Sequence, residues 1–131
     1  MIDFEKKEKK RIVYENAGAI AFTPFVSKNA FEIRIFSKKH SPYFENALDA
    51  DIDDAAEALR AVLKKIKKNL NDPDYNFFIH TAPIQEKERY KIYHWHIEVV
   101  PKTNINAGFE LGTGVEINEV DPDQAASLLR K

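Results

Sequence analysis

The sequence contains no cysteine. Disulfide bonds and thiolate metal ligands are therefore excluded, so a bound transition metal would have to use imidazole and carboxylate groups. Glycine is also scarce, since the chain has only four glycines, and three of them fall within residues 107–114. The side chains best suited to chemistry are therefore the four histidines.

Long hydrophobic runs and a dominant charge are lacking as well. No apolar stretch approaches the ~20 residues that a helix needs to cross a bilayer. Glu15 and Asn16 interrupt any signal-peptide core. The formal net charge of −1 gives no basic surface for nucleic acid. We therefore expect a soluble, cytoplasmic protein with neither a nucleic-acid nor a membrane partner.

The length of 131 residues and a hydrophobic share of 44% predict a single compact domain over residues 1–131. Its clearest element is a helix over about 51–70, where apolar residues recur at helical spacing. Acidic residues at its start and lysines at its end suit the helix dipole, and the run Asn71-Asp72-Pro73-Asp74 ends it. A short C-terminal helix is predicted after Asp121, because Pro122 suits the first helical position.

Strand-like patterns account for much of the remaining chain. Residues 31–36 alternate between apolar and charged side chains, which predicts a half-buried strand. Further strands are predicted over 11–14, 19–25, 75–80, 91–100 and, as a short one, 115–117. Residues 81–90 would join two of these strands as a long hairpin. The pattern predicts an α+β domain with a mainly antiparallel sheet, one long helix and a short C-terminal helix.

Three of the four histidines fall in the two strands of this hairpin. His94 and His96 are two residues apart, so on a strand they project from one face, roughly 6.6 Å apart at the backbone. Depending on the register, His80 would lie across from Ile92 or His94, directly or diagonally. Glu98 shares the face of the histidines, whereas Tyr93 and Trp95 point to the opposite face and are expected in the core.

These residues by themselves leave three interpretations of the histidines open. They are polar strand residues bonded to neighbours, or they bind a divalent metal together with His80. In the third interpretation one histidine attacks a phosphorus atom and the other assists. Glu98 could complete a metal shell or orient an imidazole, although a surface carboxylate is the more common case.

Five segments, taken in order, resemble a known family. They are Arg11-Ile12-Val13-Tyr14-Glu15-Asn16, Phe31-Glu32-Ile33, Phe78-Ile79-His80, His94-Trp95-His96 and Gly108-Phe109-Glu110-Leu111-Gly112-Thr113-Gly114. Together they resemble the C-terminal half of galactose-1-phosphate uridylyltransferase, and in particular the branch that includes ADP-glucose phosphorylase-like relatives. That family belongs to the histidine-triad superfamily, so the resemblance implies a histidine-triad-like domain with an antiparallel sheet.

The resemblance also implies site residues and a role. His80, His94 and His96 match three histidines that hold a structural metal in family members, which implies Zn²⁺ or Fe²⁺. The family's fourth ligand is a glutamate of the N-terminal half, and this chain has no matching position. The glycine-rich segment resembles a loop that reaches substrate, which implies substrate contacts from Phe109, Leu111, Gly112 and Thr113. A tight glycine turn between strands is the alternative for that segment.

The family's catalytic histidine lies in a His-Pro-His-x-Gln motif of the N-terminal half, and this chain contains no such motif. The resemblance therefore implies half of a nucleotidyltransferase that supplies a metal-binding scaffold but no catalytic residue. Its partners would be UDP-sugar and sugar 1-phosphate in the full enzyme, an N-terminal sister domain and a second copy in a homodimer.

Two other functions remain open. One is a stand-alone histidine-triad nucleotide hydrolase with His96 as its nucleophile, although Glu98 occupies the place of the motif's third histidine. The other is a non-catalytic module for nucleotide binding or dimerisation.

Overall fold

A computed structural model describes residues 1–85 and 88–131. The described residues form one antiparallel sheet of five strands in the order β1-β2-β3-β5-β4. Its strands are β1 (Ile12–Glu15), β2 (Ala19–Phe22), β3 (Ile33–Ser37), β4 (Tyr75–His80) and β5 (His96–Pro101). The helices are α1 (Ile2–Glu8), α2 (Asp49–Asn69), α3 (Gly108–Thr113) and α4 (Pro122–Arg130), with a 3₁₀ turn at Phe44–Asn46. The expected α+β class is confirmed.

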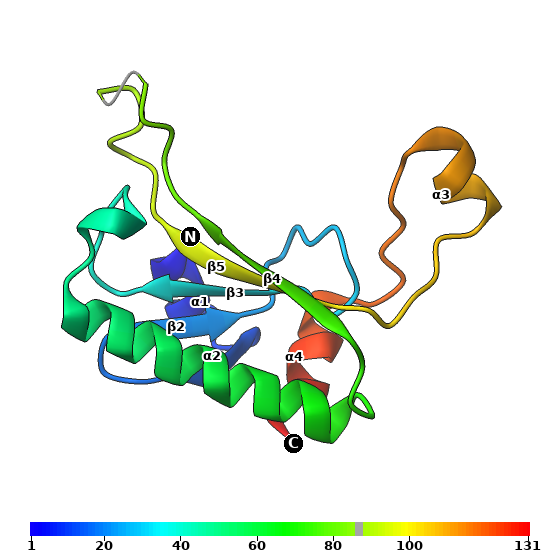
Figure 1. Ribbon diagram of the computed structural model, residues 1–131. Helices are drawn as coiled ribbons and strands as arrows, with labels where there is room; N and C mark the ends of the chain where they lie inside the picture. Colours follow the sequence, from blue (N-terminus) through cyan, green and yellow to red (C-terminus); the bar gives the residue numbers. More distant parts are fainter. Residues whose placement is uncertain (86–87) are drawn as a thin grey trace.

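The long helix α2 covers one face of the sheet, as Figure 1 shows. Its buried side chains pack on alternate residues of β2, β3 and β5, and Trp95 joins this core with 1% of its surface exposed. The predicted long helix and the burial of Trp95 are therefore confirmed. The buried residues of α2 are Ala55, Ala58, Val62 and Ile66.

The C-terminal helix α4 lies on the same side of the sheet and closes the core beside α2. It begins as predicted, because the Asp121 side chain accepts hydrogen bonds from the backbone amides of Asp123 and Gln124, at 2.8 and 3.2 Å. Its buried residues are Ala125, Ala126 and Leu129.

The opposite face is only partly covered. Helix α1, which the sequence analysis did not predict, lies behind the sheet in Figure 1 and packs Ile2 against the buried cluster of Ile20, Phe22 and Phe36. It is held by Glu5, which forms a buried ion pair with Arg11 at 3.0 Å. Beyond α1, the described residues of β5 on this face are only partly buried, and we call it the open face.

Several predicted boundaries are wrong. The strand predicted over 91–100 begins only at His96, because residues 90–95 make other contacts: Tyr93 N bonds to Tyr90 O, and Trp95 N bonds to Ser41 O. The strand predicted from Phe31 begins at Ile33, since Phe31 has a φ of 59°. Phe31 and residues 90–93 form local turns, and Trp95 bonds to a distant loop; the alternating pattern reveals neither.

The glycine-rich segment also differs from expectation. It forms the short helix α3, and no strand is described over 115–117. Gly114 ends α3 with a φ of 71°, a left-handed conformation that glycine adopts without strain. The alternative of a tight turn between two strands is therefore wrong. Among the described residues, no helix is long and apolar enough to cross a membrane.

Candidate functional site

A row of stacked rings crosses the open face of the sheet. His96 on β5 lies opposite Phe36 on β3 and opposite His80 on β4. The ring centroids of His96 and His80 are 4.8 Å apart, and those of His96 and Phe36 are also 4.8 Å apart. A direct pairing of His80 with Ile92 or His94 is not found, because the β4–β5 register pairs His80 with His96 and leaves His94 two residues farther along.

The adjacent row adds a carboxylate. Glu98 lies two residues along β5, opposite Arg34 on β3 and Phe78 on β4. One potential ligand atom from each of His80, His96 and Glu98 can be chosen so that all three lie within 4.8 Å of one another. We call these three residues the His/Glu group. Glu98 has a side chain only 17% exposed, so it is not the ordinary surface carboxylate that the sequence favoured.

The surroundings of His96 favour its neutral imidazole. Burial lowers the pKa of His96, and the nearby charge of a protonated His80 would lower it further, while the hydrogen bond to the backbone of His94 raises it. His96 Nδ1 lies 3.0 Å from the carbonyl oxygen of His94. When Nδ1–H donates to that oxygen, Nε2 keeps its lone pair and is able to bind a cation.

His94 lies outside the His/Glu group. It precedes β5, and its ring contacts Phe36 edge-on at 5.4 Å between centroids and His40 at 5.1 Å. Burial lowers the pKa of His94, so its imidazole is also favoured in the neutral form. Its participation in a metal shell stays a prediction.

Comparison with known proteins places the chain in a family. The family model described as "Galactose-1-phosphate uridyl transferase, C-terminal domain" matches residues 1–131. The chain belongs to this family.

Two curated relatives match this uridyl transferase family domain along nearly its whole length. ADP-glucose phosphorylase of Arabidopsis thaliana is 38% identical over 128 residues, which are 97% of this chain and 36% of the relative. Galactose-1-phosphate uridylyltransferase of Thermotoga maritima is 28% identical over 134 residues, which are 97% of this chain and 42% of the relative. The chain therefore spans less than half the length of either relative.

Solved structures agree with this assignment. An ADP-glucose phosphorylase from Arabidopsis thaliana with bound ADP-glucose superposes with a TM-score of 0.86 at 33% identity, over 99% of this chain and 46% of that one. A zinc-bound histidine triad family protein from Mycobacterium smegmatis superposes with a TM-score of 0.65 at 15% identity, over 91% of this chain and 80% of that one. The second likeness shows the fold alone, and it confirms the expected histidine-triad-like architecture.

The residues of the family domain fit a divalent transition metal. His80 Nε2 and His94 Nε2 are buried, and within the described residues neither has a hydrogen-bond partner. A buried nitrogen without a partner is costly unless something binds it. Imidazole nitrogen together with carboxylate oxygen is a donor set that suits Zn²⁺ or Fe²⁺.

The predicted substrate-binding residues of the family domain lie elsewhere. Phe109, Leu111, Gly112 and Thr113 belong to α3, which stands away from the sheet at the end of a long loop in Figure 1. Phe109 is 56% exposed and Leu111 is 75% exposed, so neither is part of the core. The fold thus does not bring these residues to the His/Glu group, and their contact with substrate stays a prediction.

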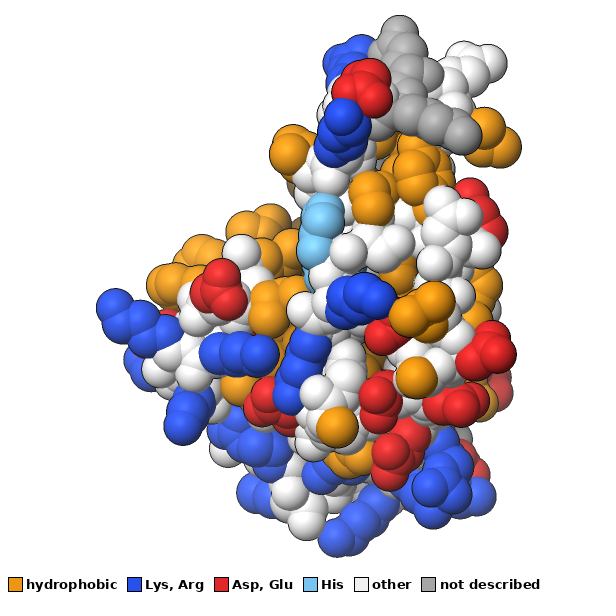
Figure 2. Space-filling view, turned by 90° about the vertical axis from the view of Figure 1, so that its left-hand side faces the viewer, with side chains coloured by type: hydrophobic (Ala, Val, Ile, Leu, Met, Phe, Trp, Pro, Cys, Tyr) orange, Lys and Arg blue, Asp and Glu red, His pale blue; other side chains and the backbone are white. Residues whose placement is uncertain are grey.

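Figure 2 shows one small area of exposed histidine on the face of the molecule that it draws. Sequence reasoning missed Arg34 and Glu32, whose side chains form an ion pair at 2.7 Å beside Glu98. The alternation of residues 31–36 predicts that Glu32 and Arg34 share one strand face. It does not predict which strand lies beside them.

Proposed function

We propose that this chain is the C-terminal half of a nucleotidyltransferase that acts on nucleotide sugars and sugar 1-phosphates. The observation that carries the proposal is the match of the family model to all 131 residues. The specific form is transfer of a uridylyl group between UDP-glucose and a hexose 1-phosphate. The 38% identity to an ADP-glucose phosphorylase supports an adenylyl group as the competing substrate class, which the experiment below distinguishes.

In this proposal the chain contributes a metal-stabilised scaffold. His80 and His96 on adjacent strands, with Glu98 or His94, would hold Zn²⁺ or Fe²⁺ and thereby link β4 to β5. A bound metal supplies coordination that fixes these strands in place. The residues of α3 would meet substrate or the surface of a partner, since their apolar side chains are exposed.

The nucleophile would be supplied by the N-terminal sister domain. Covalent transfer through a histidine divides the reaction between two anionic reactants into two displacements. His96 is a poor nucleophile in a metal-bound state, because the cation engages its free lone pair. We therefore expect this chain alone to transfer no nucleotidyl group.

A labelling experiment tests this function. The chain is incubated with UDP-glucose or ADP-glucose that carries ³²P in the phosphate next to the nucleoside, alone and with the N-terminal half of the Arabidopsis relative. We expect label on protein only in the mixture, carried by the added half, and the preferred nucleotide identifies the base. Absence of labelling and turnover in the mixture, while a matched Arabidopsis C-terminal half restores both, would contradict the proposal.

The stand-alone hydrolase is tested in the same assay. Hydrolysis of an adenosine phosphoramidate by the chain alone, abolished in His96→Ala, would replace the half-enzyme proposal with that function. Binding of a nucleotide without labelling or turnover in any mixture would favour the non-catalytic module.

We also propose that the chain forms a homodimer. Among the described strands, β4 pairs only with β5, and it carries half-exposed apolar side chains, a combination that favours association with another strand. The exposed fractions of Tyr75, Phe77, Phe78 and Ile79 lie between 43% and 48%. Light scattering should give a dimer mass at high micromolar concentration, reduced toward the monomer mass in Phe77→Lys. A monomer mass for the unaltered chain would contradict the proposal.

A further inference from the structure

One carboxylate oxygen of Glu98 lies between an imidazole and a guanidinium. Glu98 Oε2 is 3.6 Å from His80 Nε2 and 3.5 Å from Arg34 Nε. Arg34 faces Glu98 directly across the β3–β5 pair. The side chain of Glu98 is therefore confined from both sides along the row that runs from β3 to β4.

The guanidinium itself is anchored by a buried carboxylate. Glu32 has a fully buried side chain, and its Oε1 accepts hydrogen bonds from Arg34 Nε at 3.0 Å and Arg34 Nη2 at 2.7 Å. Its Oε2 accepts hydrogen bonds from the backbone amides of Lys28 and Asn29, at 2.9 and 3.3 Å. A buried carboxylate with four donors has little freedom to move, so Arg34 is held in one place.

The charges of this arrangement leave Glu98 available to a cation. Glu32 and Arg34 cancel each other, so the Glu32–Arg34 pair adds no net charge next to the His/Glu group. The orientation of Glu98 is fixed by a neighbour that is itself fixed. Such neighbours of a ligand typically change metal affinity 10–100-fold when they are removed.

We propose that Arg34, anchored by Glu32, is a positioning residue that holds Glu98 Oε2 toward His80 and so sets the cation affinity of the His/Glu group. The inference rests on the proposed function, because it takes this group as the metal centre of the domain.

The test compares two double variants with the unaltered chain. Glu32→Gln/Arg34→Met removes the pair without changing the net charge, and glutamine keeps an oxygen for the amides of Lys28 and Asn29. The matched control is Glu5→Gln/Arg11→Met, which removes a second buried ion pair with a separation of 3.0 Å. Co²⁺ is the probe, and its dissociation constant, the visible spectrum of the bound ion and the urea midpoint are measured for each protein.

We expect Glu32→Gln/Arg34→Met to bind Co²⁺ about 10–100-fold more weakly, with an altered spectrum. The control should bind Co²⁺ with the affinity and spectrum of the unaltered chain, whatever its urea midpoint. Adding Glu98→Gln to the first double variant should weaken binding no further than Glu98→Gln alone, because Arg34 acts through Glu98.

Three outcomes would overturn the inference. One is unchanged or tighter Co²⁺ binding by Glu32→Gln/Arg34→Met, and another is a loss that adds fully to that of Glu98→Gln. In both cases the proposed metal centre stands. Absence of Co²⁺ binding by the unaltered chain would instead overturn the metal centre and this inference together.

A single variant covers the case in which Glu32→Gln/Arg34→Met does not fold. Arg34→Lys keeps the charge that Glu32 needs, but its ammonium lacks the planar fork that serves two carboxylates at once. We expect weaker Co²⁺ binding and an altered spectrum in this variant too. Binding and a spectrum like those of the unaltered chain would overturn the inference.

Discussion

Strands β3 and β5 have opposite chemistry on their two faces. The residues that face α2 are apolar and at most 6% exposed, namely Ile33, Ile35, Ile97 and Val99. The residues between them form the open face, where the side chains of Arg34 and Glu98 are 23% and 17% exposed. The covered face thus stabilises the strands that hold the His/Glu group, so site residues can be replaced without removing the core.

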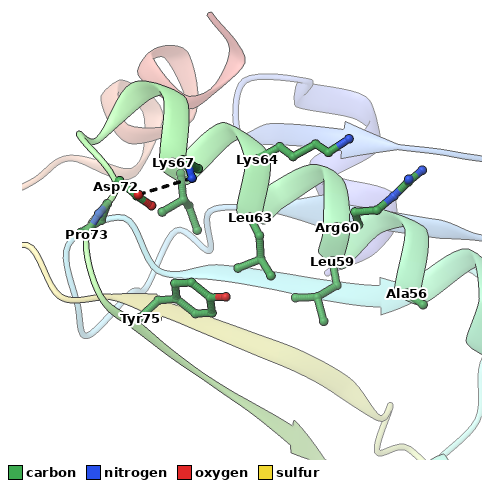
Figure 3. Close-up of a pocket in the computed structure, with 10 residues that line it drawn as sticks. Ala56, Leu59, Arg60, Leu63, Lys64, Lys67, Asp72, Pro73 and Tyr75 are labelled. Atoms are coloured by element: carbon green, nitrogen blue, oxygen red, sulfur yellow. Dashed lines mark ion pairs between the residues drawn. The ribbon is translucent and has the colours of Figure 1, made fainter.

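On the covered face, burial decreases at the outer strand β4. Ile35, Ile97 and Ile79 form one row across β3, β5 and β4, but Ile79 is 44% exposed whereas Ile35 is fully buried. Farther along β4, a groove of about 480 Å³ opens between α2 and Tyr75. In Figure 3, Leu63 and Tyr75 lie along it. The core therefore ends before β4, which is stabilised mainly by its pairing with β5.

The largest expected effect is a difference in stability loss between the centre of the Ile35–Ile97–Ile79 row and its edge. Ile35→Ala should lower the free energy of unfolding by about 2–5 kcal/mol, because it leaves a cavity in a closed core. The matched variant Ile79→Ala removes the same atoms from a half-exposed position and should cost about 1 kcal/mol or less. Urea denaturation measures both. Equal losses would show that the core extends to β4.

Metal binding should stabilise the open face. Zn²⁺ at a free concentration of 100 times its dissociation constant should raise the free energy of unfolding by about 2.7 kcal/mol. His80→Ala and His96→Ala should abolish the gain, and a chelator should reverse it. Glu57→Ala is the control, since Glu57 is an exposed carboxylate on α2, which covers the opposite face of the sheet. Thermal melts with and without Zn²⁺ would contradict the metal centre if all four proteins responded alike.

The same thermal melts test whether His94 is a metal ligand. If it is a ligand, as the family resemblance implies, His94→Ala should reduce the stabilisation by Zn²⁺ as His80→Ala does. If the His/Glu group binds the metal without His94, His94→Ala should keep most of the stabilisation by Zn²⁺. Any loss of stability in this variant should then be the same with and without the metal.

A smaller effect on stability is expected at the start of α4, the helix that closes the core beside α2. Asp121→Ala should lower the free energy of unfolding by about 1 kcal/mol, because two amides of the first turn of α4 lose their acceptor. Asp121→Asn keeps the acceptor oxygen and should recover most of the loss. Urea denaturation would contradict the capping role if the two variants were equally destabilised.

The smallest expected effect is a pH dependence at the edge near β1. The hydrogen bond from Lys38, at 2.7 Å, lowers the pKa of Glu15. The folded state therefore binds a proton at Glu15 less readily than the unfolded state does. The resulting stabilisation is present above the unfolded pKa of about 4.3 and is lost as the pH falls through the lower, folded pKa.

The measurement compares the unaltered chain with Glu15→Gln in urea at pH 7 and at pH 3. The difference between them should shrink at the lower pH. Because Glu15 is 38% exposed and solvent screens the pair, the difference at pH 7 should not exceed about 1 kcal/mol. A difference that grew on acidification would contradict this assignment.

Much of the covered face could be predicted from sequence, because its pattern is periodic. The spacing of apolar residues over 51–70 identified α2, and Asp121 with Pro122 identified the start of α4. Helix α1 was missed because its stabilising contact, from Glu5 to Arg11, joins a helix to the chain beyond it and leaves no local pattern.

The candidate site was only partly predictable. The sequence singled out His80 and His96, and it placed Glu98 on the same face as His96. It did not identify Arg34 and Glu32 as neighbours, because their contact with Glu98 depends on which strand lies beside β5.

By itself, the sequence determined the local elements, the residues that share a strand face and the absence of thiolate chemistry, since each follows from neighbouring residues or from composition. Only the tertiary structure decided that His80 pairs with His96, that His94 turns toward His40, and that Glu98 lies between His80 and Arg34. Strand order and register decide these contacts, and both depend on packing between segments far apart in the chain.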